Sequence, residues 1–361
     1  MNEINLYKII IDVCFKKFVR ILKIEVWINI LLNSLLKTNP DTLIIINPKA
    51  SGGKYENDIE GFCNALIHQL GENITIKITK KAGDATRFTR KYIKKNYQKI
   101  IAIGGDGTLN EVATGFFEPT PKYITTSEKL HDLILISSKV VFGIIPGGTR
   151  NILAKSLKIP TDPLEVCNNI KMFKPKKIDL ISIVSQNSKK RLQIRICLNA
   201  AEIGIRAEII DRAKMIREKI NSRTISTALG IISTLPSYQS NECEIVLDEG
   251  RKKINTNMTM AIVANGSYIA GGFQPAYNAK ISDGFLDIVI VNDSGSLKFL
   301  TSLIDIKMED HSDKANIIYE QAKNEILSSL DREVTVTSDG EPIGILPASF
   351  KIHKQILNIM T

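Results

Sequence analysis

The chain has 361 residues, of which 43% are hydrophobic and 24% charged, so it can form two folded domains and is not an intrinsically disordered protein. The formal net charge of +10 favours anionic partners, but the basic residues occur in short groups with few aromatic residues among them, which disfavours nucleic acid. The five cysteines lie far apart without a CxxC pair, which excludes a disulfide framework and a zinc site and predicts buried thiols in the cytoplasm.

Residues 1–38 form an N-terminal extension that is apolar on most faces but interrupted by charged residues, among them Asp12, Lys16 and Arg20. No uninterrupted apolar stretch reaches the ~20 residues that a membrane-spanning helix needs, and no signal-peptide cleavage pattern follows. Three alternatives fit the extension: an amphipathic helix in a membrane interface with Trp27 at the boundary, an additional packed helix, or a start site assigned too far upstream. The first of them predicts a cytoplasmic protein that contacts the inner face of the membrane peripherally.

Residues 39–158 alternate between short apolar runs and segments with helical spacing. Strands are expected at 41–47, 73–79, 99–103 and 140–145, and helices at 56–70, from Asp84 onward, at 108–116 and at 152–157. The polar and irregular residues 118–138 are typical of an insertion. The order of strands and helices predicts an α/β domain with a doubly wound parallel sheet.

Residues 159–361 have a different pattern, in which β-rich segments follow one another at short intervals. Extended segments are expected at 176–184, 191–200, 241–248, 258–265, 285–291 and 333–342, and helices at 205–219, 223–234 and 296–307. This half of the chain therefore predicts a second, β-rich domain that is built mainly on antiparallel sheets.

The stretch "GGDGTLNEV" begins where the strand at 99–103 ends and a helix begins. Its glycines, Gly104, Gly105 and Gly107, let backbone N–H groups converge on an anion, and the helix dipole adds favourable potential. A carboxylate at Asp106 would repel a phosphate unless Mg²⁺ lies between the two. The loop therefore predicts a Mg-nucleotide site in the 39–158 domain, and a surface turn with a solvated aspartate is the alternative.

Two further loops follow strands of the same expected sheet. "NPKASGGKY" is not a Walker A loop, because Pro48 and Tyr55 occupy positions that the Walker A pattern reserves for Gly and for Ser or Thr. "PGGTRNILA" brings glycines together with Thr149 and Asn151, whose hydroxyl and amide groups suit a nucleotide. Since the carboxyl ends of parallel strands meet at one edge of a sheet, the three loops are expected to line one cleft.

Taken together, five motifs resemble the diacylglycerol kinase catalytic-domain family, which includes bacterial lipid kinases and sphingosine kinases and is similar in fold to the NAD kinases. The motifs are "NPKASGG", "GGDGTLNEV", "PGGTRNILA", "NGSYIAGGFQPAYNAKISDGFLDI" and "SDGEP", in the family's order, and the likeness covers roughly residues 41–352. The resemblance implies an ATP site between an α/β lobe and a β-sandwich lobe.

The resemblance also implies which residues bind ATP and metal. The ATP-binding positions are Asn47, Thr79, Gly104, Gly105, Asp106, Gly107, Thr108, Leu109, Asn110, Glu111, Gly148, Thr149 and Asn151. In "AKISDGF", Lys280 and Phe285 match positions that hold a structural Mg²⁺ through backbone carbonyls, and Asp283 matches one that binds it through a carboxylate. Without the resemblance, "ISDGF" would be interpreted as a hairpin turn.

The catalytic residues implied are Glu341 and Asp106. Glu341 in "SDGEP" matches the general base of the bacterial enzymes, while Asp106 is the rival for that role because some relatives use the loop aspartate. One position departs from the pattern: many members have Asn-Asp in the third loop, whereas this chain has Asn151 followed by Ile152. Any contact assigned to that aspartate is therefore in doubt.

The expected function is an ATP- and Mg²⁺-dependent kinase that phosphorylates a lipid hydroxyl, with diacylglycerol as the default acceptor. The alternatives are a NAD kinase, which shares "GGDGT", and a catalytically silent lipid-binding or regulatory protein of the same fold. The sequence identifies neither the acceptor nor the oligomeric state. Expected partners are a lipid substrate and, peripherally, a membrane, but not nucleic acid.

Overall fold

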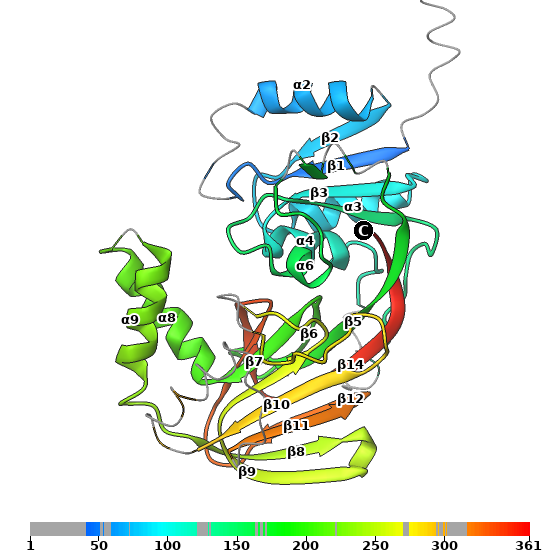
Figure 1. Cartoon of the computed structure of the whole chain (residues 1–361). Coiled ribbons are helices and arrows are strands. Elements are labelled where there is room, and N and C mark those ends of the chain that lie inside the picture. Colours follow the sequence, from blue (N-terminus) through cyan, green and yellow to red (C-terminus); the bar gives the residue numbers. More distant parts are fainter. Residues whose placement is uncertain are drawn as a thin grey trace, which may run out of the picture.

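The computed structural model describes residues 41–361 with internal gaps at 51–52, 54–58, 72, 121–128, 130, 163–164, 167–168, 170–171, 221, 270–273, 294, 296–298, 300 and 302–315. The N-terminal extension and nearly all of the helix expected at 296–307 lie outside the described residues. Figure 1 shows an α/β lobe beside a β-rich lobe, with two helices projecting from the β-rich lobe.

The α/β lobe contains the strands and helices that the sequence predicts. They are β1 (Thr42–Ile46), α2 (Ile59–Leu70), β2 (Ile74–Ile78), α3 (Asp84–Ile93), β3 (Lys99–Gly104), α4 (Asp106–Thr114), β4 (Val141–Pro146) and α6 (Ile152–Ser156). The four strands are mutually parallel in the order β2-β1-β3-β4. Helix α4 begins at Asp106, two residues before the predicted start, because the carbonyl of Gly105 already accepts the amides of Thr108 and Leu109.

Buried aliphatic side chains explain why these strands lie inside the lobe. Every residue of β1 is buried, and in β3 the five residues after Lys99 are buried as well. Continuous burial rather than alternation is typical of strands that are covered on both faces. In the predicted insertion, Lys129 is the one described residue that is helical, no described residue belongs to a strand, and Leu135 pairs with Phe117 only through an isolated bridge.

The β-rich lobe is antiparallel, as the sequence predicts. Its elements are β5 (Pro175–Gln186), β6 (Leu192–Cys197), β7 (Ala200–Gly204), α8 (Ile205–Arg217), α9 (Arg223–Thr234), β8 (Asn241–Leu247), the 3₁₀ turn η3 (Asp248–Gly250), β9 (Lys252–Ala264), β10 (Leu286–Asn292), β11 (Ile317–Ala322), β12 (Asn324–Ser329), β13 (Thr335–Ser338) and β14 (Glu341–Met360). Successive pairings of β9, β7, β13, β14, β12 and β8 return to β9 and so close a ring. Its interior is a second hydrophobic core.

The extended segment expected at 191–200 is two strands, β6 and β7, and this part of the prediction is wrong. The chain breaks at Leu198 and Asn199, whose amides donate to the carboxylate of Asp339 instead of continuing the β6 ladder. Asn199 at the break is a residue type that favours turns, but the carboxylate that holds the chain there lies 140 positions away in the sequence.

The expected doubly wound parallel sheet is not confirmed as a separate unit. The four parallel strands continue into the antiparallel ones, and the described strands form a single 14-stranded sheet. The junction is β14, which pairs with β4 at Ile359 and Phe142 and runs antiparallel to β5. Because β5 and β14 each supply residues to both main cores, the domain boundary at 158/159 stays a prediction.

Three cysteines lie within the described residues, and all are free thiols: Cys197 and Cys243 are buried, and Cys63 is half-buried. Cys14 and Cys167 lie outside the described residues. Among the helices that the structure describes, none is both long enough and apolar enough to cross a bilayer.

Candidate active site

Asp106 lies where β3 ends and α4 begins. Its Oδ1 accepts the backbone amides of Ile152 at 2.8 Å and Leu153 at 3.3 Å, so the carboxylate lies at the start of α6. Burial raises the pKa of Asp106, and the nearby charge of Asp339 raises it further, although the two amides and Arg150 act in the opposite direction. The aspartate therefore joins the second glycine loop to the third, and its proton affinity is higher than that of a solvated carboxylate.

Asp339 approaches the same place from the β-rich lobe, in the turn between β13 and β14. Its carboxylate accepts the backbone amides of Leu198 at 3.0 Å, Asn199 at 2.9 Å and Ala200 at 3.3 Å. The side chain of Asn110 in α4 also donates to Asp339 at 2.9 Å, and to the carbonyl of Ile196 at 2.7 Å. These bonds fix the turn and connect the two lobes.

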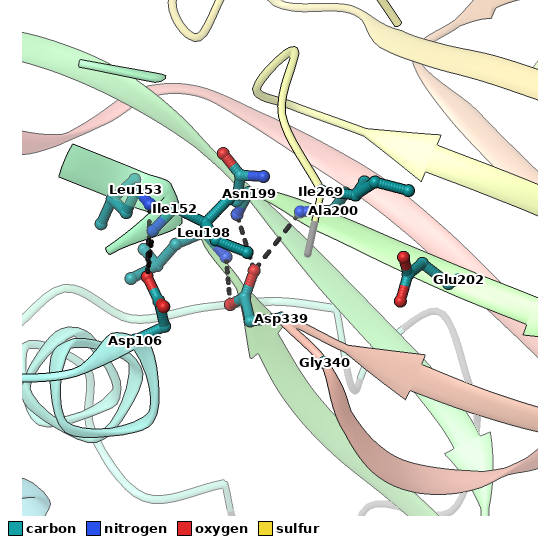
Figure 2. A pocket seen from close by; sticks show the side chains of 10 residues that line it. All are labelled: Asp106, Ile152, Leu153, Leu198, Asn199, Ala200, Glu202, Ile269, Asp339 and Gly340. Atoms are coloured by element: carbon teal, nitrogen blue, oxygen red, sulfur yellow. Dashed lines mark hydrogen bonds between the residues drawn. The ribbon is translucent and has the colours of Figure 1, made fainter. Parts of the chain in front are cut away.

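A pocket lies between Asp106 and Asp339 (Figure 2). The α/β lobe contributes Asp106, Ile152 and Leu153, and the β-rich lobe contributes Leu198, Asn199, Ala200, Glu202, Ile269, Asp339 and Gly340. Three carboxylates thus line one pocket, Asp106 from the α/β lobe and Glu202 and Asp339 from the β-rich lobe, and most of the other lining residues are apolar. The pocket lies at the carboxyl ends of β3 and β4, the edge where parallel sheets bind ligands.

The second and third glycine loops touch each other, which explains why glycine is needed at position 148. A Cβ atom on Gly148 would lie 2.4 Å from the Cα of Gly105, and one on Gly105 would lie 3.2 Å from the Cα of Gly148. The loop is closed by Asn151, which has a φ of 49° and accepts the Gly148 amide through Oδ1 at 2.8 Å. The sequence correctly expected these loops to converge.

Four more of the residues predicted to bind the nucleotide, Asn47, Thr79, Gly107 and Thr108, follow the carboxyl ends of β1, β2 and β3. Asn47 donates to the hydroxyl of Thr108 at 2.9 Å, which links the loop after β1 to α4. The amide and hydroxyl of Thr79, just after β2, both reach the carbonyl of Ile46, at 2.9 and 3.3 Å. Gly107 is exposed, with no atom within 4 Å of the position that a Cβ would take.

Two predicted nucleotide residues have clear structural contacts of their own. Glu111 accepts the amides of Gly83 at 2.9 Å and Ala85 at 3.2 Å, so it caps the start of α3. Leu109 is buried in the core of the α/β lobe. Thr149 is exposed on the third loop. Nucleotide binding by these residues stays a prediction.

Glu341, the predicted general base, is the first residue of β14 and lies opposite Ser338 of β13. Its side chain is exposed and does not line the pocket between Asp106 and Asp339. Its role stays a prediction, while Asp106, the alternative base, borders the pocket directly.

The predicted metal residues form a compact turn before β10. The carbonyl of Lys280 accepts the amides of Ser282 at 2.7 Å and Asp283 at 3.3 Å, and Oδ1 of Asp283 accepts the amide of Phe285 at 3.1 Å. Asp179 binds the next residue of the turn, Gly284, at 2.6 Å. Within the described residues, no three His, Cys, Asp or Glu side chains gather as a metal site. None of the described residues between β9 and β10 is in a strand, so the turn does not close a hairpin, and metal binding stays a prediction.

Sequence reasoning missed several residues of the pocket. Asp339 is the main one: it belongs to the "SDGEP" motif, in which the family resemblance assigns a role to Glu341 only. Arg150 lies in "PGGTRNILA", and a Cβ on Gly340 would be 2.8 Å from its Nη1, which puts the guanidinium against the Asp339–Gly340 turn. Glu202 belongs to none of the motifs that predicted the site. In the structure, its Oε2 forms an ion pair with Nε of Arg206 at 2.9 Å.

Comparison with known proteins is consistent with this geometry. The family model for the diacylglycerol kinase catalytic domain matches residues 41–183 of the sequence, and the family model for the YegS C-terminal NAD kinase beta sandwich-like domain matches residues 199–361. The chain belongs to the diacylglycerol kinase catalytic-domain family. The pocket between Asp106 and Asp339 lies between residues matched by the two models of this family.

Individual relatives of the family are distant but match most of the chain. The diacylglycerol kinase of Bacillus subtilis is 26% identical over 321 residues, 88% of this chain and 95% of that protein. The diacylglycerol kinase of Staphylococcus carnosus is 25% identical and covers 82% of this chain and 87% of its own length. A crystal structure of a diacylglycerol kinase from Bacillus anthracis shares the fold, with a TM-score of 0.61 and 22% identity over 89% of this chain and 96% of that one. Lipid-kinase function is thus supported at the level of the family.

Proposed function

We propose that the protein is an ATP-dependent lipid kinase, which transfers the γ-phosphate to a lipid hydroxyl with diacylglycerol as the default acceptor. The observation that carries this proposal is the pair of carboxylates, Asp106 and Asp339, that face one pocket from two lobes beside the glycine loops. Phosphoryl transfer depends on positioning and electrostatics, which a cleft between two lobes can supply.

ATP would bind along the carboxyl ends of the parallel strands. The contact between Gly105 and Gly148 brings two N–H-rich loops together at the start of α4, where backbone donors suit phosphate oxygens. Open space at Gly107 would permit close approach of a phosphate. Thr79, Thr149 and the amide of Asn151 are the proposed contacts to the rest of the nucleotide.

The residues fit a role for Mg²⁺. Oδ1 of Asp106 accepts two amides, whereas its Oδ2 makes no hydrogen bond within the described part of the chain, which leaves a hard oxygen ligand at the pocket. When bound, Mg²⁺ would neutralise charge on the transferred phosphoryl group. In the β-rich lobe, burial chiefly raises the pKa of Asp179, and the negative charge of Asp283 contributes. A cation held by Lys280, Asp283 and Phe285 would offset the repulsion between these two carboxylates.

The general base would be Glu341 or Asp106. Asp106 is supported by its position at the pocket and by its raised pKa, which makes a carboxylate a better proton acceptor. Glu341 is supported by the family resemblance and is exposed beside the Asp339 turn, where a substrate could reach it. The apolar walls of the pocket, formed by Ile152, Leu153, Leu198 and Ile269, suit an acceptor whose hydroxyl adjoins hydrocarbon.

Two alternatives remain from the sequence, a NAD kinase and a silent lipid-binding protein. Ile152, the departure from the family pattern, favours the silent protein, because no carboxylate is present at that position. Its backbone amide nevertheless donates to Asp106, so the loop supports the aspartate even without an acidic side chain.

The test is transfer of labelled γ-phosphate from ATP to a mixed lipid extract with Mg²⁺. We expect labelled lipid from the wild type and a loss of about 100-fold or more for the variant that removes the base, Glu341→Gln or Asp106→Asn. Glu249→Gln, an exposed carboxylate on η3, is the matched control and should retain full activity. Chromatography of the labelled lipid identifies the acceptor class.

Nucleotide binding without labelled lipid would contradict the proposal. Adding NAD to the same reaction then separates the alternatives, because labelled NADP would identify a NAD kinase and its absence would favour the silent binder. Equal activity in both carboxylate variants and the control would refute the assignment of the base to either residue.

A further inference from the structure

Helices α8 and α9 form a pair that projects from the β-rich lobe, away from the rest of the molecule (Figure 1). Helix α8 begins at Ile205, directly after β7, whose residues Ala200 and Glu202 line the pocket. Its first turns are anchored by Ile205 and Ile209, which pack in a third core together with Ile269 of the pocket wall. The helix pair is therefore attached to the candidate active site.

Helix α9 (Arg223–Thr234) packs against the third core with Ile231 and with Leu235 at its C-terminal end, and against α8 with small and polar residues. The face that packs inward carries Ser226, Gly230 and Thr234, all buried and spaced four residues apart. Gly230 allows close packing, since a Cβ there would lie 3.0 Å from the Cβ of Ala213 in α8.

A second set of apolar side chains on α9 is exposed. Ile225, Leu229 and Ile232 follow the spacing i, i+4, i+7, so they share one face, and their exposed fractions are 51%, 38% and 61%. Two more apolar side chains near the other end of α8, Met215 and Ile220, are 67% and 37% exposed. We call these five residues the α8–α9 surface. Apolar side chains that are exposed together on a helix pair in this number are typical of an interaction site.

Basic residues accompany this surface. Lys214 and Lys219 are exposed and Arg217 is half-exposed, whereas Glu218 is the only acidic residue between positions 214 and 222. Apolar side chains next to lysines are the combination that binds an anionic bilayer, because the apolar groups enter the acyl boundary and the ammonium groups remain at the phosphates.

We propose that the α8–α9 surface docks on an anionic phospholipid bilayer and so holds the pocket at the membrane. The inference rests on the proposed function, since a lipid acceptor would be taken from that bilayer. The positive charge of the surface and the net charge of +10 disfavour a second copy of the chain as the occupant. Because a 13-residue helix is about 20 Å long, β7 and the pocket would lie within about that distance of the bilayer.

The test is sedimentation of the full chain with vesicles of phosphatidylglycerol and phosphatidylcholine in equal amounts, and with phosphatidylcholine alone. We expect binding to the anionic vesicles that weakens with salt. The variant Ile225→Gln/Leu229→Gln/Ile232→Gln keeps good helix formers and should bind about tenfold or more weakly. Lys214→Gln/Lys219→Gln should lose about fivefold per lysine on anionic vesicles only.

The control is Ile326→Gln/Leu330→Gln, which removes two apolar side chains that are 48% and 62% exposed on and after β12. It should sediment like the wild type. Unchanged sedimentation of both the triple and the lysine variant would overturn the proposal. The proposal would also be overturned if light scattering showed that the wild type is a dimer and that, among the variants, only the triple variant is a monomer. The α8–α9 surface would then bind a second copy of the chain.

Kinase assays keep this proposal separate from the proposed function. The triple variant should phosphorylate a short-chain, monomeric diacylglycerol as the wild type does, but lose activity on vesicle-bound diacylglycerol. A wild type that binds anionic vesicles and phosphorylates no lipid would refute the kinase and leave the docking surface standing.

Discussion

Glu325 allows a quantitative prediction about pH and stability. It lies in β12 between β8 and β14, opposite Leu247 and Phe350, and is completely buried. Because Leu327, two residues later, belongs to the interior core of the ring, Glu325 faces the same interior. Within the described part of the chain, neither of its carboxyl oxygens has a hydrogen-bond partner.

Burial raises the pKa of Glu325 from 4.5 to about 8. At pH 7 the residue is therefore neutral in the folded protein and ionised in the unfolded chain. A raised carboxyl pKa stabilises the folded state fully below pH 4.5, and this stability is lost as the pH rises toward 8. With about 1.4 kcal/mol for each pH unit, the free energy of unfolding at pH 7 is lowered by about 3 kcal/mol.

The substitution Glu325→Met replaces the carboxyl with an apolar group of similar size. We expect the variant to be more stable than the wild type at pH 7, and the difference in free energy of unfolding to grow by about 1.4 kcal/mol per unit between pH 5 and 8. Urea unfolding of both proteins across this range measures the difference, in which the other titrating groups cancel. Leu327→Met, two residues further along the same buried face of β12, changes no titratable group and is the matched control, so it should show no such slope.

A difference between wild type and Glu325→Met that stays constant from pH 5 to 8 would refute the reasoning. It would mean that the carboxyl is ionised in the folded state and has a partner or water that the packing does not indicate. A variant that is less stable at every pH would show instead that the core cannot accept the methionine side chain.

The remaining predictions concern three other places. Burial chiefly lowers the pKa of His131 and of His353 to about 4. Each neutral imidazole therefore contributes about 3 kcal/mol to the free energy of unfolding above pH 6.5, and this contribution is lost as the pH falls toward 4. His353→Gln should make the free energy of unfolding, measured with urea, fall less steeply in acid. Gly148→Ala should cost about 1–3 kcal/mol and weaken ATP binding in calorimetry, because its Cβ would lie 2.4 Å from the Cα of Gly105. Asp339→Asn should lower the urea midpoint by the equivalent of about 1–3 kcal/mol, because the amide cannot accept from all its present donors; an unchanged midpoint would contradict that role.

The strands and helices of the α/β lobe could be predicted from the sequence because their signals are local. Buried runs such as residues 42–46 and the start of α3 near Asp84 depend on neighbouring residues only. The continuation of the parallel strands into the antiparallel sheet could not be predicted in this way. It depends on β14, which reaches β4 through one residue pair, Ile359 and Phe142, more than 200 positions apart in the chain.

The candidate site divides in the same manner. The convergence of the glycine loops and the position of Asp106 followed from motifs placed at strand ends. The importance of Asp339 did not, because three of its donors, Leu198, Asn199 and Ala200, use backbone amides, which carry no residue-specific signal. Its side-chain donor, Asn110, lies 229 positions away in the sequence. The position of Glu202 in the pocket could not be predicted either, because it depends on the register of β7 against β9 and β13.

The sequence by itself therefore determined the family, the order of the elements and the loops that meet at the strand ends, since these depend on composition and spacing over a few residues. Only the tertiary structure decided that Asp106 and Asp339 share a pocket, that Glu325 is buried with no hydrogen-bond partner among the described residues, and that Ile225, Leu229 and Ile232 of α9 are exposed. Each of these depends on which distant segment packs against which face, and that choice is made by the whole fold rather than by any local pattern.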